Sequence, residues 1–237
     1  YSIDAFEKVH ALRINKTGQK EPFDNFSYFQ AWPRLEGGYL AYMTHYNQPA
    51  IRTIFFGRTE DGVNWDYPVK IAAIEEGHYQ VSYATPGRTG SAFNFHPSRE
   101  RKGVTSGINS RTNLYYVESY DEGKTWQNIQ GEVLSLPLTE QKNPALVHDY
   151  WSEGLTVYMK DIQLTPEGQP LIFYLVSPGA ELGPENMPRV TMTARWNGTE
   201  WIKLPVFESD NNYDTGSLYI ESSTRWRVIA PSDTGPQ

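Results

Sequence analysis

Two histidines lie at the ends of a stretch, 78–96, whose pattern predicts a β-hairpin. Pro86-Gly87 near its centre is a strong turn signal, and residues on both sides alternate between polar and apolar types, as in strands. If the chain folds back about Gly87, His78 and His96 face each other with Cβ atoms about 5 Å apart. Imidazoles titrate near neutral pH, so this pair could donate and accept a proton. The alternative is a structural hairpin whose polar face meets water.

Strand alternation gives this predicted hairpin one polar and one apolar face. The polar face would carry His78, Gln80, Ser82, Asn94 and His96. The other face would carry Tyr79, Val81, Tyr83, Phe93 and Phe95. Whether the polar face does chemistry depends on the elements that surround it.

The composition limits the classes of function. A chain of 237 residues can bury a sizeable core and is one domain or part of one. Its net charge of -7 offers no basic stripe for nucleic acid, although a local arginine cluster could bind an anionic sugar. The absence of cysteine excludes disulfides and thiolate chemistry. No stretch approaches the roughly 18 apolar residues of a membrane span. The chain begins at Tyr1, which we interpret as processing or truncation.

Short strand-like segments separated by turn residues predict an all-β fold. They form three groups of four, followed by a pair, and the groups recur roughly every 50–60 residues, which is typical of β-propeller blades. A β-sandwich is the main alternative, because it also has many short strands at even spacing. The predicted strands are 26–32, 38–45, 51–58 and 65–73; 78–85, 89–96, 112–119 and 126–134; 155–163, 170–177, 189–196 and 201–207; and 216–222 with 225–230.

Turns between the third and fourth strands of each group favour the propeller. Residues 119–126 fit Ser-x-Asp-x-Gly-x-Thr-Trp, which resembles the Asp-box of sialidases and other BNR-repeat propellers. There Asp121 would bind the turn backbone, Gly123 would supply a positive φ and Trp126 would pack between blades. Residues 59–65 and 197–201 are degenerate copies. We expect one β-propeller domain over 1–237, with four-stranded antiparallel blades and Asp-box turns, covering about four blades of a larger propeller. A closed four-bladed ring is the alternative.

Many polar residues fall at the blade edge away from these turns. In an antiparallel meander, the start of the first strand, the end of the second and the start of the third share one edge. His78, His96 and Arg111 take these places in the second group, and Arg189 begins the third strand of the third. The other candidates at this edge are Asn113, Asp149, Tyr150, Tyr174, Tyr213 and Asp214. Two long connections, 97–111 and 178–188, also gather there, as functional loops do.

The aromatic and cationic candidates also have structural interpretations. Tyr174 alternates with Ile172 and Val176, which fits a core aromatic equally well. Arg189 could be a solvated charge or a bidentate clamp on a carboxylate, and Arg88 and Arg111 could form the same clamp.

The two aspartates and the histidine pair also allow more than one interpretation. Asp149 and Asp214 could be catalytic acids, but their aromatic and Asn neighbours suit turns or sugar contacts. The histidine pair with an aspartate could hold zinc, although no short metal-ligand spacing supports it. We therefore expect no cofactor, with a structural metal ion as the alternative.

Beyond the turns, the whole chain resembles the BNR-4 group of propeller proteins found among polysaccharide-degrading systems. The resembling stretches are GHYQVS at 77–82, SAFNFHP at 91–97, RTNLYY at 111–116, NPALVHDY at 143–150, VYMKDIQLTPEGQPLIFYLVS at 157–177, NYDTGSLYI at 212–220 and the closing WRVIAPSDTGPQ. This group is similar to the seven-bladed ulvan lyases and rhamnose-glucuronate lyases, which use His and Tyr as acid and base and Arg against the uronate carboxylate. By position, the resemblance implies these roles for His78, His96, Tyr174 and Arg189.

The resemblance implies a secreted or periplasmic protein whose partner is an acidic oligo- or polysaccharide. The expected reaction is β-elimination, with Arg neutralising the carboxylate and His or Tyr moving the proton. Gln80, Arg88, Asn94, Arg111, Asn113, Asp149, Tyr150, Tyr213 and Asp214 would bind the sugar. A sialidase-like or other glycoside hydrolase is one alternative, although Leu12-Arg13-Ile14-Asn15 lacks the proline of the sialidase motif. A non-catalytic glycan-binding propeller is the other.

Overall fold

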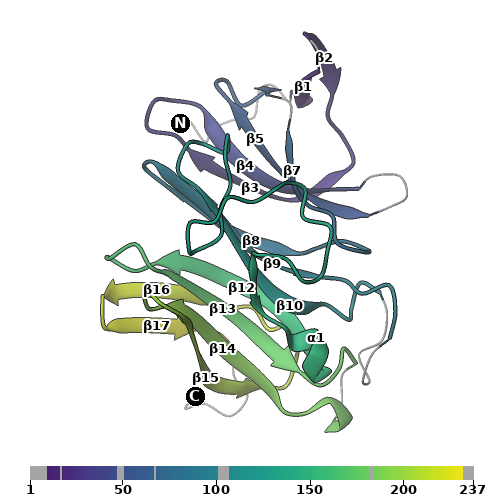
Figure 1. Cartoon of the computed structure of the whole chain (residues 1–237), viewed down its shortest axis with the longest axis vertical. Coiled ribbons are helices and arrows are strands. Elements are labelled where there is room, and N and C mark those ends of the chain that lie inside the picture. Colours follow the sequence, from purple (N-terminus) through teal and green to yellow (C-terminus); the bar gives the residue numbers. More distant parts are fainter. Residues whose placement is uncertain are drawn as a thin grey trace, which may run out of the picture.

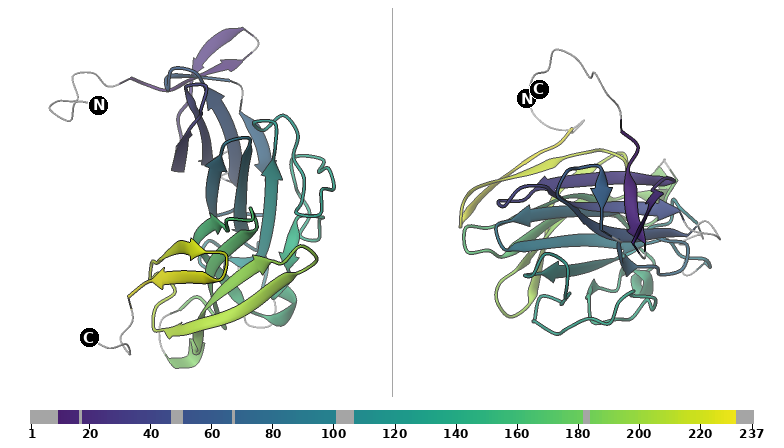
Figure 2. Two further views of the ribbon diagram at one scale, coloured as in Figure 1. Left: turned by 90° about the vertical axis from the view of Figure 1, so that its left-hand side faces the viewer. Right: turned by 90° about the horizontal axis from the view of Figure 1, so that it is seen from above.

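The computed structural model describes residues 10–16, 18–46, 51–66, 68–100, 107–181 and 184–231. Within these residues the regular elements are almost all strands, in four sheets that follow one another along the molecule (Figure 1). The side view in Figure 2 shows the sheets in a curved row, with the N-terminal sheet at one end. No helix among the described residues is long and apolar enough to cross a membrane.

The first sheet is centred on three long strands, β3 (Phe26–Pro33), β4 (Tyr39–Tyr46) and β5 (Arg52–Thr59). The short strands β6 (Asn64–Trp65) and β7 (Val69–Ala72) both pair with β5, so the predicted strand 65–73 is divided in two. A hairpin of β1 (Arg13–Lys16) and β2 (Gln19–Pro22) joins the sheet through parallel pairing of β1 with β6. The sequence analysis missed this hairpin, because its residues alternate only weakly.

The second and third sheets are four-stranded and antiparallel. The second contains β8 (Gln80–Thr85), β9 (Arg88–Phe95), β10 (Thr112–Ser119) and β11 (Leu146–His148). The third contains β12 (Thr156–Leu164), β13 (Pro170–Ser177), β14 (Arg189–Trp196) and β15 (Trp201–Ser209). A two-stranded sheet, β16 (Ser217–Ser222) and β17 (Arg225–Ile229), follows. The described helices are short: α1 (Tyr150–Glu153) and the 3-10 turn η1 (Pro184–Asn186).

One predicted strand is wrong. Residues 126–134 form only isolated bridges, Glu118 with Gln127 and Gln127 with Val133, and β11 takes the fourth place in the second sheet. Trp126 and Leu134 at the two ends of this segment are buried anchors, so its apolar residues resemble those of a strand. Gly131 between them has a φ of 86°, which interrupts an extended run.

The register of the β8–β9 hairpin differs from the predicted one by a single residue. Thr85 pairs with Arg88, so the turn has two residues and its centre is the Pro86-Gly87 bond rather than Gly87. A one-residue change moves side chains to the other face of a strand. The predicted face-to-face pairing of His78 and His96 is therefore wrong, and the two imidazoles belong to different faces of the hairpin.

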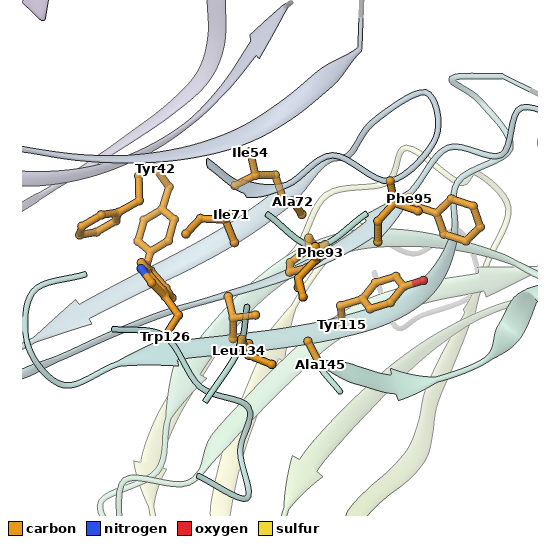
Figure 3. Packing of buried hydrophobic residues seen from close by; sticks show 14 of the residues in the cluster. Tyr42, Ile54, Ile71, Ala72, Phe93, Phe95, Tyr115, Trp126, Leu134 and Ala145 are labelled. Carbon is orange, nitrogen blue, oxygen red and sulfur yellow. The ribbon is translucent and has the colours of Figure 1, made fainter. Parts of the chain in front are cut away.

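Hydrophobic cores fill the spaces between successive sheets. The first lies between the first and second sheets, where Tyr42 lies beside Trp126, and Ile54, Phe93 and Tyr115 belong to the same cluster (Figure 3). A second core joins the second and third sheets, and its buried residues are Tyr83, Ala92, Leu114, Tyr116, Tyr150, Val157, Ile162, Ile172, Tyr174, Val176 and Ala194. A smaller one, with Leu171, Phe173 and Leu218, joins the third sheet to β16. Each large apolar side chain buried in this way contributes roughly 1.5–3 kcal/mol.

The turn at 119–126 ties the second sheet to the first. The hydroxyl of Ser119 accepts the N–H of Gly123 at 2.8 Å, and Asp121 Oδ1 accepts the N–H of Thr125 at 2.9 Å. The indole of Trp126 donates back to the Gly123 carbonyl at 3.0 Å. Its ring then packs edge-on against Phe56 of the first sheet, 5.1 Å between centroids. The turn therefore positions a buried tryptophan between two sheets.

Residues 59–65 form the same kind of turn in the first sheet. Thr59 Oγ1 accepts the N–H of Gly62 at 3.0 Å, Asp61 Oδ1 accepts the N–H of Asn64 at 2.7 Å, and the Trp65 indole donates to the Gly62 carbonyl at 3.3 Å. At 197–201 only Asn197 is left to accept backbone N–H groups. The hydroxyl, the aspartate and the tryptophan that the turns at 59–65 and 119–126 share thus make the same kinds of bond in both.

Candidate functional site

Arg111, immediately before β10, lies among three tyrosines. Its guanidinium carbon is 3.9 Å from the ring centroid of Tyr79, 4.8 Å from Tyr158 and 5.3 Å from Tyr213. Its Nε donates to the carbonyl of Ile108 at 3.1 Å. Among the residues that the structure describes, no carboxylate forms an ion pair with Arg111. The guanidinium is thus oriented by aromatic faces and a carbonyl, and the described part of the chain gives it no ion-pair partner.

A pocket of about 160 Å³ opens beside this guanidinium. Its lining comes from the start of β10, from β12 and from the segment before β16, and consists of Arg111, Tyr158, Met159, Lys160, Asn212, Tyr213 and Thr215. Tyr213 is 50% exposed and donates to the Asn109 side-chain oxygen at 2.9 Å, while the buried Tyr158 donates to the Asn109 carbonyl. Burial raises the pKa of Tyr158 to about 12, an effect that Arg111 opposes. Asn109 thus orients both phenols.

Lys160 brings a second cation to the pocket. Its ammonium donates to the carbonyl of Asn212 at 2.7 Å. Burial lowers the pKa of Lys160 to about 8, with Asp214 opposing and Arg111 adding to the shift. The Asp214 carboxylate accepts a hydrogen bond of 2.5 Å from Ser209. Two cations on the wall of one small pocket suit an anionic ligand, and a lysine with this pKa can also act as a base.

Tyr79 and His96 form the support beneath Arg111. The His96 ring is fully buried and lies 4.8 Å from the ring of Tyr79, on the same face of the hairpin. Neither ring nitrogen of His96 has a hydrogen-bond partner among the described residues. Burial lowers its pKa well below the usual value, so the ring is neutral at physiological pH. Burial also raises the pKa of Tyr79 to about 12. His96 therefore lies behind the site and not in its opening.

His78 has the environment of a structural histidine. Its ring is fully buried, and Nδ1–H donates to the carbonyl of Asn94 at 2.7 Å while Nε2 accepts the N–H of Ile74 at 2.8 Å. Both nitrogens are occupied by backbone groups, and burial lowers the pKa of His78 to about 4. These bonds fix a neutral tautomer. The predicted acid–base role does not fit this position.

Tyr174 and Arg189 are also enclosed. Tyr174 lies in the core between the second and third sheets, bonded at 2.8 Å to the hydroxyl of Tyr150, and burial raises its pKa well above the usual value. Arg189 is 1% exposed and donates to the carbonyl of Glu181 at 2.6 Å. A sugar has no access to either group, so the predicted roles as base and carboxylate clamp do not fit. Tyr150, with its own hydroxyl on Tyr174, is likewise buried.

The predicted amide ligands hold the fold together. Asn94 accepts the N–H of Tyr79 at 3.0 Å and donates to the carbonyl of Val157 at 2.9 Å. Asn113 accepts the N–H of Trp151 at 2.7 Å. Gln80 is 5% exposed and donates to the carbonyl of Tyr28 at 3.4 Å. All three bond to backbone groups and are not open to a ligand.

The two remaining candidates lie outside the pocket. Asp149 caps α1 by accepting the N–H of Ser152 at 3.0 Å. Arg88 lies at the other edge of the second sheet, beside the Pro86-Gly87 turn, and pairs with the buried Glu118 at 2.5 Å. Parts of the two long connections, 101–106 and 182–183, and the chain end 232–237 lie outside the described residues. No group of three or more His, Cys, Asp or Glu suited to a metal occurs in the described part of the chain.

The structure thus brings together Arg111, Tyr213 and Asp214 from the predicted set, with His96 behind them. It adds Tyr79, Tyr158 and Lys160, which the sequence analysis did not single out. Tyr158 and Lys160 are two residues apart in a predicted strand, so alternation would have placed both on one face. A lysine inside the apolar run VYMKDIQL was the available signal.

The chain is similar to several polysaccharide lyases. An ulvan lyase, PL25, from Pseudoalteromonas sp. (strain PLSV) is 28% identical over 93 residues, which is 39% of this chain and 19% of the relative. Structures of a PL25 ulvan lyase, one of them bound to GlcA(1-4)Rha3S, match with a TM-score of 0.67 and 19% identity over 92% of this chain and 53% of theirs. The polysaccharide lyase Uly1 matches with a TM-score of 0.53 and 13% identity over 99% of this chain and 61% of its own.

These likenesses establish a shared fold, and the chain spans about half the length of the ulvan lyase structures. The family described as BNR repeat-containing family member matches residues 37–209, well over half of the chain. The chain belongs to the BNR repeat-containing family.

Proposed function

We propose that this chain is part of a polysaccharide lyase that binds a uronate-containing glycan at Arg111 and cleaves it by β-elimination. The observation that carries the proposal is the guanidinium of Arg111, which has no ion-pair partner among the described residues and is held by three tyrosines beside a pocket lined by a second cation. A carboxylate fits the planar fork of an arginine in a bidentate manner. Aromatic rings around the fork can cover the apolar faces of a sugar.

The difficult step of the reaction is removal of the proton from C5 of the uronate, because this C–H group is a weak acid. The bond from C5 of the uronate to hydrogen is broken while the carboxylate next to it is already negative, so charge builds up on the carboxyl group. Arg111 would neutralise this charge and stabilise the enolate-like intermediate, a type of electrostatic effect worth about 2.7–4 kcal/mol for a single well-placed donor. Collapse of that intermediate forms the C4–C5 double bond and breaks the bond from C4 to the glycosidic oxygen.

Two pocket groups are suited to move the protons. Lys160, with a pKa of about 8, has a substantial neutral fraction in mildly alkaline solution and would take the C5 proton. Tyr213 is half-exposed and lines the pocket, and its hydroxyl would turn from Asn109 to protonate the leaving oxygen. Tyr158, buried against the ring of Tyr213, would orient that phenol, and His96 would support Arg111 through Tyr79.

We also propose that the sheets are blades of a β-propeller, of which this chain covers about four. Support comes from contacts between the first strands of successive sheets, since β8 contacts β3 and β12, and β12 contacts β16. The Asp-box-like turns at 59–65 and 119–126 and the shared fold with the ulvan lyases add to this support. Because polysaccharides of this kind are extracellular, we propose a secreted or periplasmic location.

A product assay tests the proposal. The protein is incubated with a glucuronate–sulforhamnose polymer, with other uronate polymers, and with the same polymers after reduction of their carboxyl groups. β-Elimination gives an unsaturated uronate at the new non-reducing end, seen by ultraviolet absorbance and by a mass lower by one water than that of a hydrolysis product. We expect this product from at least one native polymer and none from the reduced ones.

Two other outcomes would replace the proposal. Saturated ends would indicate a hydrolase, which needs a carboxylate pair about 5–10 Å apart. The capping role of Asp149 speaks against the predicted pair with Asp214. Binding without turnover would indicate a glycan-binding protein, and the burial of His78 and Tyr174, the predicted acid and base, favours this second candidate.

A further inference from the structure

Tyr28 has a backbone conformation that a bulky residue adopts only under constraint. Its φ is 52°, in the left-handed region, where a tyrosine is a genuine outlier. It lies in a β-bulge, because the pairing of β3 with β4 shifts by one residue between Ser27 and Gln30. Such strain is retained where the surrounding structure imposes it, and it concentrates at ligand sites.

The bulge sends neighbouring aromatics in different directions. Phe29 packs edge-on against Trp65 and close to Phe26, on the outer face of the first sheet. Tyr28 instead reaches toward the second sheet, where its ring meets the edge of Tyr79 at 4.7 Å and its carbonyl accepts a bond from Gln80. A regular strand would place Phe26 and Tyr28 on the same face. The bulge therefore serves to aim Tyr28 at the support of Arg111.

Tyr28 remains open to solvent in this position. Its side chain is 49% exposed, whereas Tyr79 beneath it is 8% exposed. From Tyr28 a continuous series of contacts runs through Tyr79 and Arg111 to Tyr213, at 4.7, 3.9 and 5.3 Å. The series begins in β3 of the first sheet, passes through the residues just before β8 and β10, and ends in the segment before β16. A surface with a half-exposed tyrosine at each end and a cation between them is wider than one sugar ring needs.

We propose that Tyr28 is the platform of a second sugar subsite, so that the site takes an oligosaccharide rather than a single uronate. The uronate carboxylate lies on Arg111, the pocket before β16 holds its ring, and a neighbouring sugar of the same chain stacks its apolar face on Tyr28. This inference rests on the proposed function, because it places the acidic residue of the glycan at Arg111. Its ligand class is an acidic oligosaccharide that extends from that residue.

The variant Tyr28→Asn tests the platform. Asparagine tolerates the left-handed region, so the ring is lost without added backbone strain. Tyr28→Phe keeps the ring, and Tyr120→Asn removes a matched tyrosine, 54% exposed and stacked on Arg88 at the other edge. Unfolding temperatures check that each variant is folded, and Tyr28→Gly replaces Tyr28→Asn if the latter is not. Affinity for glucuronic acid and for uronate oligosaccharides of increasing length is measured by calorimetry, or as KM and kcat where the ligand is cleaved.

We expect Tyr28→Asn to weaken binding of the longer oligosaccharides about 5- to 10-fold and to leave glucuronic acid unaffected. Tyr28→Phe and Tyr120→Asn should match the wild type at every length. Equal weakening at all lengths, glucuronic acid included, would show that Tyr28 only supports Tyr79 and would overturn the platform. Unchanged binding in Tyr28→Asn would overturn it too, provided that Arg111→Gln abolishes binding. If no uronate binds the wild type in an Arg111-dependent manner, the proposed function fails with it.

Discussion

Arg88 and Arg111 are two arginines with similar neighbours and different surroundings. Both stack on tyrosines, Arg88 on Tyr83 and Tyr120 at 5.8 and 5.3 Å, and Arg111 on its three rings at 3.9 to 5.3 Å. Arg88 also pairs with Glu118, a carboxylate that is 1% exposed. The described part of the chain offers Arg111 no such partner. The cluster of arginine and tyrosines therefore includes a carboxylate partner at one edge of the second sheet and, among the described residues, lacks one at the other.

The other charged and polar groups around the two arginines differ in the same way. Around Arg88, the Glu118 carboxylate also accepts from the Tyr116 hydroxyl at 2.7 Å and from Gln127 at 3.3 Å, so the buried charge is fully bonded. Beside Arg111, the same pocket is lined by the cation of Lys160, which adds to the positive potential. A closed network stabilises a fold, whereas an open cation invites an anion from solution. Aromatic stacking alone does not distinguish them; the presence or absence of a carboxylate does.

The largest expected effect is on the closed edge. Arg88→Ala leaves the buried Glu118 without its counter-charge, which should cost about 3–5 kcal/mol in the free energy of unfolding, measured by urea denaturation. The control Arg58→Ala breaks two more exposed pairs, with Asp66 at 2.8 Å and with Glu122 at 3.6 Å, and should cost less than about 1 kcal/mol. Adding Glu118→Gln to Arg88→Ala should recover part of the loss. A loss below about 1 kcal/mol for Arg88→Ala would mean that this edge is not the structural one.

Arg111 variants should show the opposite pattern. Arg111→Gln is expected to lower kcat/KM on an acidic glycan, or its affinity if there is no turnover, about 100-fold, because the carboxylate loses its charged partner. Its free energy of unfolding should change by less than about 1 kcal/mol, since no buried carboxylate is left behind. Arg111→Lys keeps the charge but loses the planar fork, so it should recover only part of the activity. A stability loss as large as that of Arg88→Ala would remove the distinction between the two edges.

Much of the fold was predictable, because local rules are strong where they apply. The strands 112–119, 170–177 and 189–196 have the predicted bounds, since each is a run of strand-forming residues between clear turn signals. The turn at 119–126 could be predicted bond by bond from Asp121 and Gly123. The edge that carries Arg111 was predictable too, because an antiparallel meander brings the ends of alternate strands together.

The candidate site was harder to predict, for two physical reasons. A Pro-Gly turn can be centred on the glycine or on the bond before it, and that single choice decided whether His78 and His96 share a face. Burial depends on partners distant in sequence, as with Tyr174, whose hydroxyl meets Tyr150 inside the core. Arg111 begins a strand and keeps an open side chain, whereas Arg189 begins the equivalent strand of the next sheet and is enclosed by the loop that contains Glu181.

The smallest expected effect concerns pH at the open edge. Lys160 has a pKa near 8, lowered by burial and by Arg111 and opposed by Asp214, so its charge is lost as pH rises through 8. Affinity for an acidic glycan should therefore fall up to about 10-fold between pH 7 and pH 9, measured by calorimetry. Stability should move the other way. Between pH 8 and 10.5 the unfolded chain keeps a proton that the folded chain has released, so the free energy of unfolding rises with pH.

Two variants isolate this contribution of Lys160. Lys160→Arg keeps a charge at every pH in this range, so its affinity should not fall between pH 7 and pH 9. Lys160→Gln has no charge to lose, so its affinity should be weak at both values and equally flat. If Lys160→Gln retains the pH dependence of the wild type, the titrating group lies elsewhere at this edge. Arg111 would then be the group that binds the anion without help from Lys160. The difference between the two edges would depend on this one guanidinium and its lack of a carboxylate partner among the described residues.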